Sequence, residues 1–66
     1  MNKATYQQMR LVELVDGAGR EGRDYLLAPA EQSDAAACVQ LGLLTVRDGV
    51  ARLTGDGRSF ILHLNT

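Results

Sequence analysis

The sequence feature that most constrains the fold is the Asp48-Gly49 step between two short runs of aliphatic and β-branched residues. The runs are residues 43–47 and 50–53, and an Asp-Gly pair between such runs favours the tight turn of an antiparallel hairpin. Pairing Arg47 with Val50 places four apolar side chains on one face: Leu44, Val46, Ala51 and Leu53. Because the turn and the alternation agree, the sequence predicts a β-hairpin.

A helix is predicted before this hairpin, between Pro29 and Gly42. Proline suits the first helical position, the Glu31 carboxylate suits the first turn, and glycine suits the position just past the last turn. The apolar side is expected to comprise Ala30, Ala35, Ala36, Ala37, Cys38, Val39 and Leu41. The exposed side is expected to comprise Glu31, Gln32, Ser33, Asp34 and Gln40.

The first part of the chain predicts a helix from Thr5 to Val15. Thr5 and Gln8 have the spacing of a capping box, and Asp16-Gly17 is expected to end the helix. Residues 17–23 contain three glycines and charges of alternating sign, which is typical of a mobile loop.

Residues 24–28 form a brief apolar run that fits either a short strand joining the hairpin or one turn of helix. Thr54 is placed to cap a closing helix, with Asp56 in its first turn. Phe60, Ile61 and Leu64 are the side chains expected to bury that helix against the first helix and the hairpin.

The chain has 66 residues, which is enough for one domain (1–66) with a thin core. Only 5% of the residues are aromatic, so aliphatic side chains must build that core. Such a small core is also consistent with a homodimer, in which a second copy adds stability.

The charged residues are nearly balanced, with seven Lys and Arg against eight Asp and Glu, interleaved along the chain. This balance disfavours strong non-specific binding to nucleic acid, which usually needs a basic stripe. One cysteine and one histidine do not make a structural zinc site, and no cofactor is expected. A single cysteine cannot form an intramolecular disulfide, so a reducing, cytoplasmic location fits best. The sequence has no apolar run of about 20 residues, so no membrane segment is expected.

The second half of the chain carries a series of short steps, namely Leu41-Gly42-Leu43-Leu44, Arg47-Asp48-Gly49, Leu53-Thr54 and Gly57-Arg58. This series resembles the winged-helix (winged helix-turn-helix) domain of bacterial regulators, over about the last 30 residues. In that family a recognition helix precedes a hairpin called the wing, and a further helix follows. The resemblance implies a small α+β fold with helices packed on the hairpin. The family has three helices before the wing, whereas this sequence predicts two, and residues 24–28 are a candidate remnant of the third.

The predicted recognition helix has no Arg or Lys, and its Glu31 and Asp34 are expected to face phosphates unfavourably, which favours a protein partner over DNA. The first functional hypothesis is therefore a non-catalytic regulator, adaptor or inhibitor that binds another protein. Its expected contact residues are Glu31, Gln32, Asp34, Gln40, Arg47 and Arg52.

The alternative hypothesis is a dimeric winged-helix regulator that binds DNA. Its expected contact residues are Gln32 and Gln40 for bases, and Arg47, Arg52 and Arg58 for phosphates. Simpler interpretations compete with both hypotheses, since Arg47 and Arg52 suit a solvated hairpin and Cys38 suits a small buried apolar residue. His63 lies in no recognisable catalytic motif, so no enzyme activity is predicted.

Overall fold

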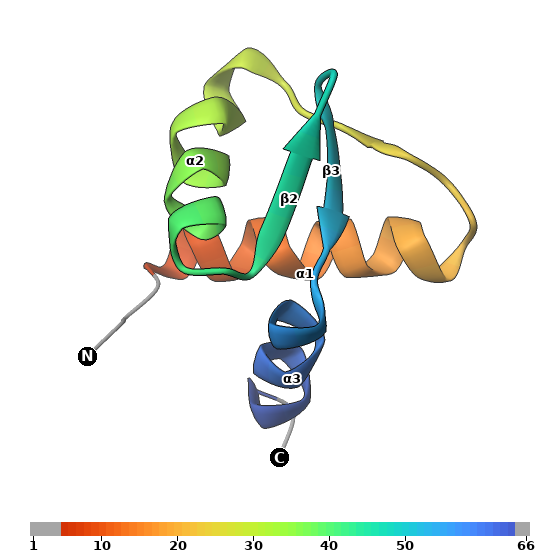
Figure 1. The fold of residues 1–66 in the computed structure, drawn as a ribbon, viewed down its shortest axis with the longest axis vertical. Coiled ribbons are helices and arrows are strands. Elements are labelled where there is room, and N and C mark those ends of the chain that lie inside the picture. Colours follow the sequence, from red (N-terminus) through yellow and green to blue (C-terminus); the bar gives the residue numbers. More distant parts are fainter. Residues whose placement is uncertain (1–4, 65–66) are drawn as a thin grey trace.

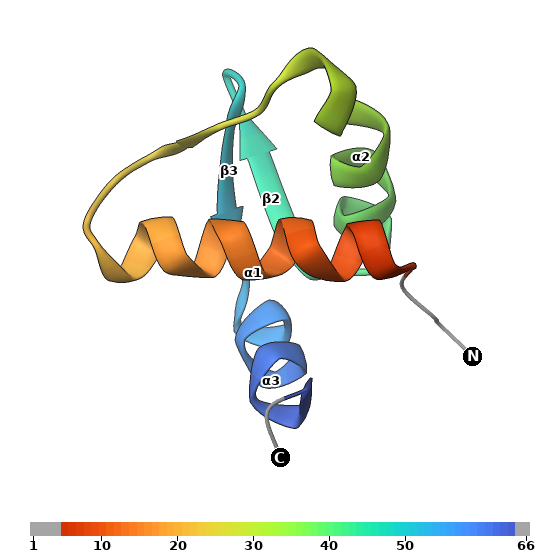
Figure 2. The same ribbon diagram turned by 180° about the vertical axis from the view of Figure 1, so that it is seen from behind.

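The long first helix, α1 (Tyr6–Arg20), runs across the molecule and contacts most of the other elements (Figures 1 and 2). The computed structural model describes residues 5–64. The other elements are β1 (Tyr25–Leu26), the 3-10 turn η1 (Pro29–Glu31), α2 (Gln32–Gln40), β2 (Leu44–Arg47), β3 (Val50–Leu53) and α3 (Gly55–Leu64). Helix α2 and the β2–β3 hairpin rise on one side of α1, and α3 lies on the other (Figure 1).

The hairpin has the predicted register, with Leu44 opposite Leu53 and Arg47 opposite Val50. Asp48 and Gly49 both have positive φ angles, 54° and 78°, as a type I′ turn requires. The predicted apolar face is only partly buried, because Val46 is 40% exposed while Leu44 and Ala51 are fully covered.

Residues 25–26 form strand β1, which pairs antiparallel with β3 and completes a sheet of order β1-β3-β2. Tyr25 lies opposite Ala51 and Leu26 opposite Val50. The helical alternative for residues 24–28 is therefore wrong, as is the idea that they are the remnant of a helix. The fold is α+β and winged-helix-like, with two α-helices ahead of the hairpin in the described residues 5–64.

Helix α1 starts as predicted but ends later. The capping box at Thr5 is confirmed, since Gln8 N donates to Thr5 Oγ1 at 3.2 Å and Thr5 N donates to Gln8 Oε1 at 3.0 Å. The predicted end at Asp16-Gly17 is wrong, and the loop predicted at 17–23 is wrong for residues 17–20, because the helix runs on to Arg20. Residues 21–23 lie outside any helix or strand, as predicted.

The reason for the later end is a glycine with a left-handed backbone. Gly22 has φ 73°, Arg23 N donates to Ala18 O at 2.9 Å, and Gly22 N donates to Gly19 O at 3.1 Å. This is the Schellman pattern that closes helices. Gly17 and Gly19 each weaken a helix by about 1 kcal/mol relative to alanine, but Ala18 between them is buried, so tertiary packing holds this turn helical.

The helical segment begins at Pro29 and ends before Gly42, as predicted, but its first three residues form the 3-10 turn η1 and α2 itself starts at Gln32. Gly42 has φ 79°, and Leu43 N donates to Cys38 O at 2.9 Å, which repeats the Schellman pattern. The predicted apolar side of this helix includes residues that the structure exposes. Ala35 and Cys38 are buried, whereas Ala30, Ala36 and Val39 are exposed, because the helical turn directs them away from the core.

The core is aliphatic, as the composition predicts, and joins all three helices to the sheet. Its buried side chains are Leu11, Val12, Val15, Ala35, Cys38, Leu43, Leu44, Ala51 and Ile61. Phe60 packs against this cluster from α3. The predicted burial of the Leu64 side chain lies outside the described part of the structure.

Thr54 joins α2, the hairpin and α3 through three hydrogen bonds. Its hydroxyl donates to Gly42 O at 2.6 Å and accepts from Gly57 N at 2.8 Å, so the predicted cap of the closing helix is confirmed. Its backbone N–H donates to Leu43 O at 3.1 Å. The start of α3 is therefore hydrogen-bonded, through Thr54, to the residues that follow α2.

We expect Gly57→Ala to destabilise the domain, because a Cβ at position 57 would lie 2.1 Å from Leu43 O. Overpacking against backbone costs about 1–3 kcal/mol. The matched control is Gly55→Ala in the same helical turn, where a Cβ meets nothing within 4 Å. Urea unfolding should show a large loss for Gly57→Ala and no loss for Gly55→Ala. Equal stability of the two variants would contradict this packing.

Candidate functional site

The outer face of α2 carries no basic side chain and exposes a mixture of amide and apolar groups. Its exposed residues are Gln32, Ser33, Ala36, Val39 and Gln40. Gln32 and Gln40, both predicted contact residues, are thus available to a ligand. This face lacks the Lys and Arg side chains that supply most of the affinity for a phosphate backbone.

One half-exposed valine lies on α2 and another on β2. Val39 on α2 is 42% exposed and Val46 on β2 is 40% exposed, and these two elements pack together. Arg47, which follows Val46, is exposed and makes no ion pair within the described residues. We call a set of exposed residues on α2 and β2 the α2–wing surface, which comprises Gln32, Val39, Gln40, Val46 and Arg47.

Glu31 was predicted to contact a partner, but both of its carboxylate oxygens are engaged within the chain. Tyr25 Oη donates to Glu31 Oε2 at 2.5 Å, and Ala28 N donates to Glu31 Oε1 at 2.8 Å. Burial raises the pKa of Tyr25 to about 12, and the hydrogen bond and negative charge of Glu31 add to the rise. Glu31 therefore ties strand β1 to the start of α2.

Asp34 lies on the flank of α2 that faces the first half of α1. It lines a groove of about 450 Å³ together with Arg10, Leu14 and the exposed ring of Tyr6. Cys38 lies beneath this flank, fully buried, with its Sγ donating to Gln8 O at 3.7 Å. Burial raises the pKa of the Cys38 thiol, and the charge of Asp34 adds to the rise. The prediction that Cys38 is a small buried apolar residue is confirmed.

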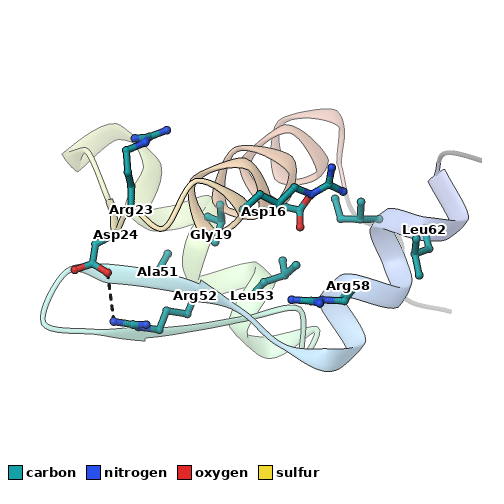
Figure 3. A pocket seen from close by; sticks show the side chains of 12 residues that line it. Asp16, Gly19, Arg23, Asp24, Ala51, Arg52, Leu53, Arg58 and Leu62 are labelled. Atoms are coloured by element: carbon teal, nitrogen blue, oxygen red, sulfur yellow. Dashed lines mark hydrogen bonds and ion pairs between the residues drawn. The ribbon is translucent and has the colours of Figure 1, made fainter.

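A second hollow, of about 620 Å³, lies between the end of α1, strand β3 and α3 (Figure 3). Its charged lining residues are Asp16, Arg20, Arg23, Asp24, Arg52 and Arg58. Arg52 reaches Asp24 with an N–O distance of 3.3 Å, whereas Arg58 extends from α3 toward Leu53 (Figure 3). We call this region the arginine hollow.

The predicted contact residues are thus distributed over separate parts of the molecule. Asp34 lines the α1–α2 groove and Arg52 lines the arginine hollow. For the DNA alternative, Arg52 and Arg58 come together in that hollow, but neither Gln32 nor Gln40 lines it. The bases and phosphates of one duplex would have to be reached from two different sites.

Sequence reasoning missed Arg20 and Arg23 as parts of a charged site, because it placed them in a loop with neighbouring carboxylates. Arg20 is in fact helical and pairs with Asp16 one turn earlier, at 3.1 Å. The glycine at position 22 was the sequence signal that could have placed the helix end after Arg20, because a glycine just past the last turn closes many helices. Val39 was missed because it was counted with the buried side of α2.

No group of three or more His, Cys, Asp or Glu side chains in residues 5–64 is arranged to hold a metal ion. Within the same range, no helix has the length and apolar character needed to cross a bilayer. Comparison with protein-family models, with curated proteins and with solved structures finds no match to this chain.

We expect Tyr25→Phe to lower stability near neutral pH by about 1–2 kcal/mol, the contribution of a hydrogen bond to a carboxylate. The folded pKa of Tyr25 is raised to about 12, above the ordinary value of about 10, so this stabilisation is present below pH 10 and is lost as the pH rises toward 12. Urea unfolding from pH 8 upward should show the gap between wild type and variant closing. Tyr6→Phe, at an exposed tyrosine, is the control, and a gap independent of pH would contradict the assignment.

Cys38 should react with a thiol reagent at least about a hundredfold more slowly in the native protein than in denaturant, because exposing it requires opening of the core. The measurement is the rate of modification by a chromogenic disulfide. The control is Cys38→Ser combined with Ser59→Cys, which moves the thiol to an exposed position and should react rapidly. Rapid modification of the native wild-type chain would show that α2 opens readily.

Proposed function

We propose that this domain is a non-catalytic binding module for another protein, acting as a regulator, adaptor or inhibitor through the α2–wing surface. The observation that carries the proposal is the pair of half-exposed valines, Val39 and Val46, on two packed elements beside an uncharged helix face. Exposed apolar side chains, amides and a guanidinium are the groups that a protein interface typically combines, with apolar residues at its centre and polar residues at its rim.

The polar rim comprises Gln32, Gln40 and Arg47, which are exposed. A standard interface covers about 800 Å² on each partner, and the described chain has an accessible surface of 4706 Å² in total. A partner of ordinary size would therefore cover both α2 and the wing. Arginine is enriched among residues that dominate binding energy, so Arg47 is the expected polar anchor.

The charge distribution on α2 supports a protein partner over DNA. The helix contains no Lys or Arg and carries the carboxylate of Asp34, with Glu31 just ahead of it. Neither carboxylate lies on the exposed face of α2, so the charge argument against DNA rests on the absence from this helix of the basic contacts that dominate DNA affinity. The resemblance to winged-helix regulators supports the proposed architecture of helix and wing.

The proposal predicts that Val39→Lys abolishes capture of a protein partner, because a charge would be buried at the centre of the interface. Tagged wild-type and variant domains would be used as bait in lysates with and without nuclease, and captured proteins identified by mass spectrometry. A supporting result is one protein that is captured equally in the presence and absence of nuclease and binds the purified domain directly. Its capture should be lost with Val39→Lys.

The matched control is Leu26→Lys, which makes the same change at a 69% exposed residue on β1, at the edge of the sheet opposite to β2. It should leave capture intact. In parallel, binding to mixed-sequence duplex DNA would be measured from low to high salt, since several phosphate contacts make affinity fall steeply. DNA binding with a steep salt dependence, reduced by Arg47→Gln and unaffected by Val39→Lys, would favour the dimeric DNA-binding alternative instead.

A further inference from the structure

Four of the six arginines in this nearly neutral chain line one hollow. Arg20 comes from the end of α1, Arg23 from the segment leading to β1, Arg52 from β3 and Arg58 from α3. In the sequence these residues are spread over a span from 20 to 58, interleaved with acids. The fold therefore concentrates positive charge that the sequence disperses.

The arginines in this hollow are available to an incoming ligand. Arg52 and Asp24 form a single contact at 3.3 Å, with side chains 71% and 62% exposed. Arg23 pairs with Glu21, and both side chains are largely exposed. Exposed pairs of this kind hold their partners weakly, so a ligand can replace the carboxylates.

Arg58 differs from the other three because it makes no ion pair with any of the residues described, 5–64. Its guanidinium extends over the hollow toward Leu53 (Figure 3). An arginine without a carboxylate partner keeps all five N–H donors for a ligand. Arg58 is therefore the residue on which anion binding should depend most.

The floor of the hollow is apolar. Ala51, Leu53 and Ile61 line it from β3 and α3, and Leu62 adds a side chain that is exposed to solvent. Guanidinium groups also stack on flat, aromatic ligands. The volume of about 620 Å³ lies within the range of about 300–1,000 Å³ typical of small-molecule sites.

We propose that the arginine hollow binds a small phosphate-bearing ligand with an apolar or aromatic body, of the size of a nucleoside monophosphate. The phosphate lies against Arg58 and Arg52, which match its oxygens with paired N–H donors, and the flat body covers Leu53 and Leu62. Asp16 stays paired with Arg20 at 3.1 Å and is only 15% exposed, so it faces the ligand with its charge already matched. This site is separate from the α2–wing surface and does not depend on it.

The test is a titration of the full chain with adenosine monophosphate, followed by the amide signals of ¹⁵N-labelled protein. We expect saturable shifts confined to residues around 19–24, 51–53 and 57–62. Inorganic phosphate alone and adenosine alone should each shift part of this set and bind more weakly. Arg58→Gln should weaken binding of the monophosphate about tenfold by removing a charge-assisted contact.

The matched control is Arg10→Gln, which removes an exposed arginine from the groove on the other side of α1 and should leave binding unchanged. Thermal unfolding of both variants, compared with wild type, separates loss of binding from loss of fold. The absence of saturable shifts with the monophosphate would overturn the proposal. So would equal weakening by the two variants, or shifts of this region by short duplex DNA but not by the monophosphate.

Discussion

The hydrogen bonds of Thr54 are the constraint on which the arrangement of the other elements depends. The Thr54 hydroxyl donates to Gly42 O, just after α2, and accepts from Gly57 N, in the first turn of α3. The Thr54 N–H meets Leu43 O, and the absence of a side chain at Gly57 allows the backbone of α3 to approach that same carbonyl. Together these contacts fix where the hairpin starts and finishes. The α2–wing surface and the arginine hollow are both placed by this junction.

The two proposed surfaces differ in the forces that they offer a ligand. The α2–wing surface combines half-exposed valines with neutral amides, so its binding energy comes from burying apolar area with a polar rim. The arginine hollow combines exposed guanidinium groups with an apolar floor, and the proposed binding of an anion rests on that combination. Because they lie on different elements, one ligand can be bound without displacing the other.

Residues with local signals were predicted correctly, and residues whose role comes from distant contacts were not. The Asp48-Gly49 turn and the Thr5 capping box rest on neighbours in the chain, and the structure has both. Glu31 was predicted to face a partner because its place in the helical pattern points outward. Its actual contacts include Tyr25, which reaches it only because β1 joins the sheet. The arginine hollow could not be predicted, because it assembles side chains from α1, β3 and α3 that the sequence keeps far apart.

By itself, the sequence determined the helices, the hairpin with its register, and the aliphatic character of the core, since turns, caps and alternation act over a few residues. Only the tertiary structure decided that residues 17–20 are helical, because packing of Ala18 outweighs two helix-weakening glycines. It also decided that residues 25–26 are a strand, because a two-residue strand exists only through hydrogen bonding to β3. Where charges gather is likewise a tertiary property, because Coulomb interactions depend on distance in space and not on separation along the chain.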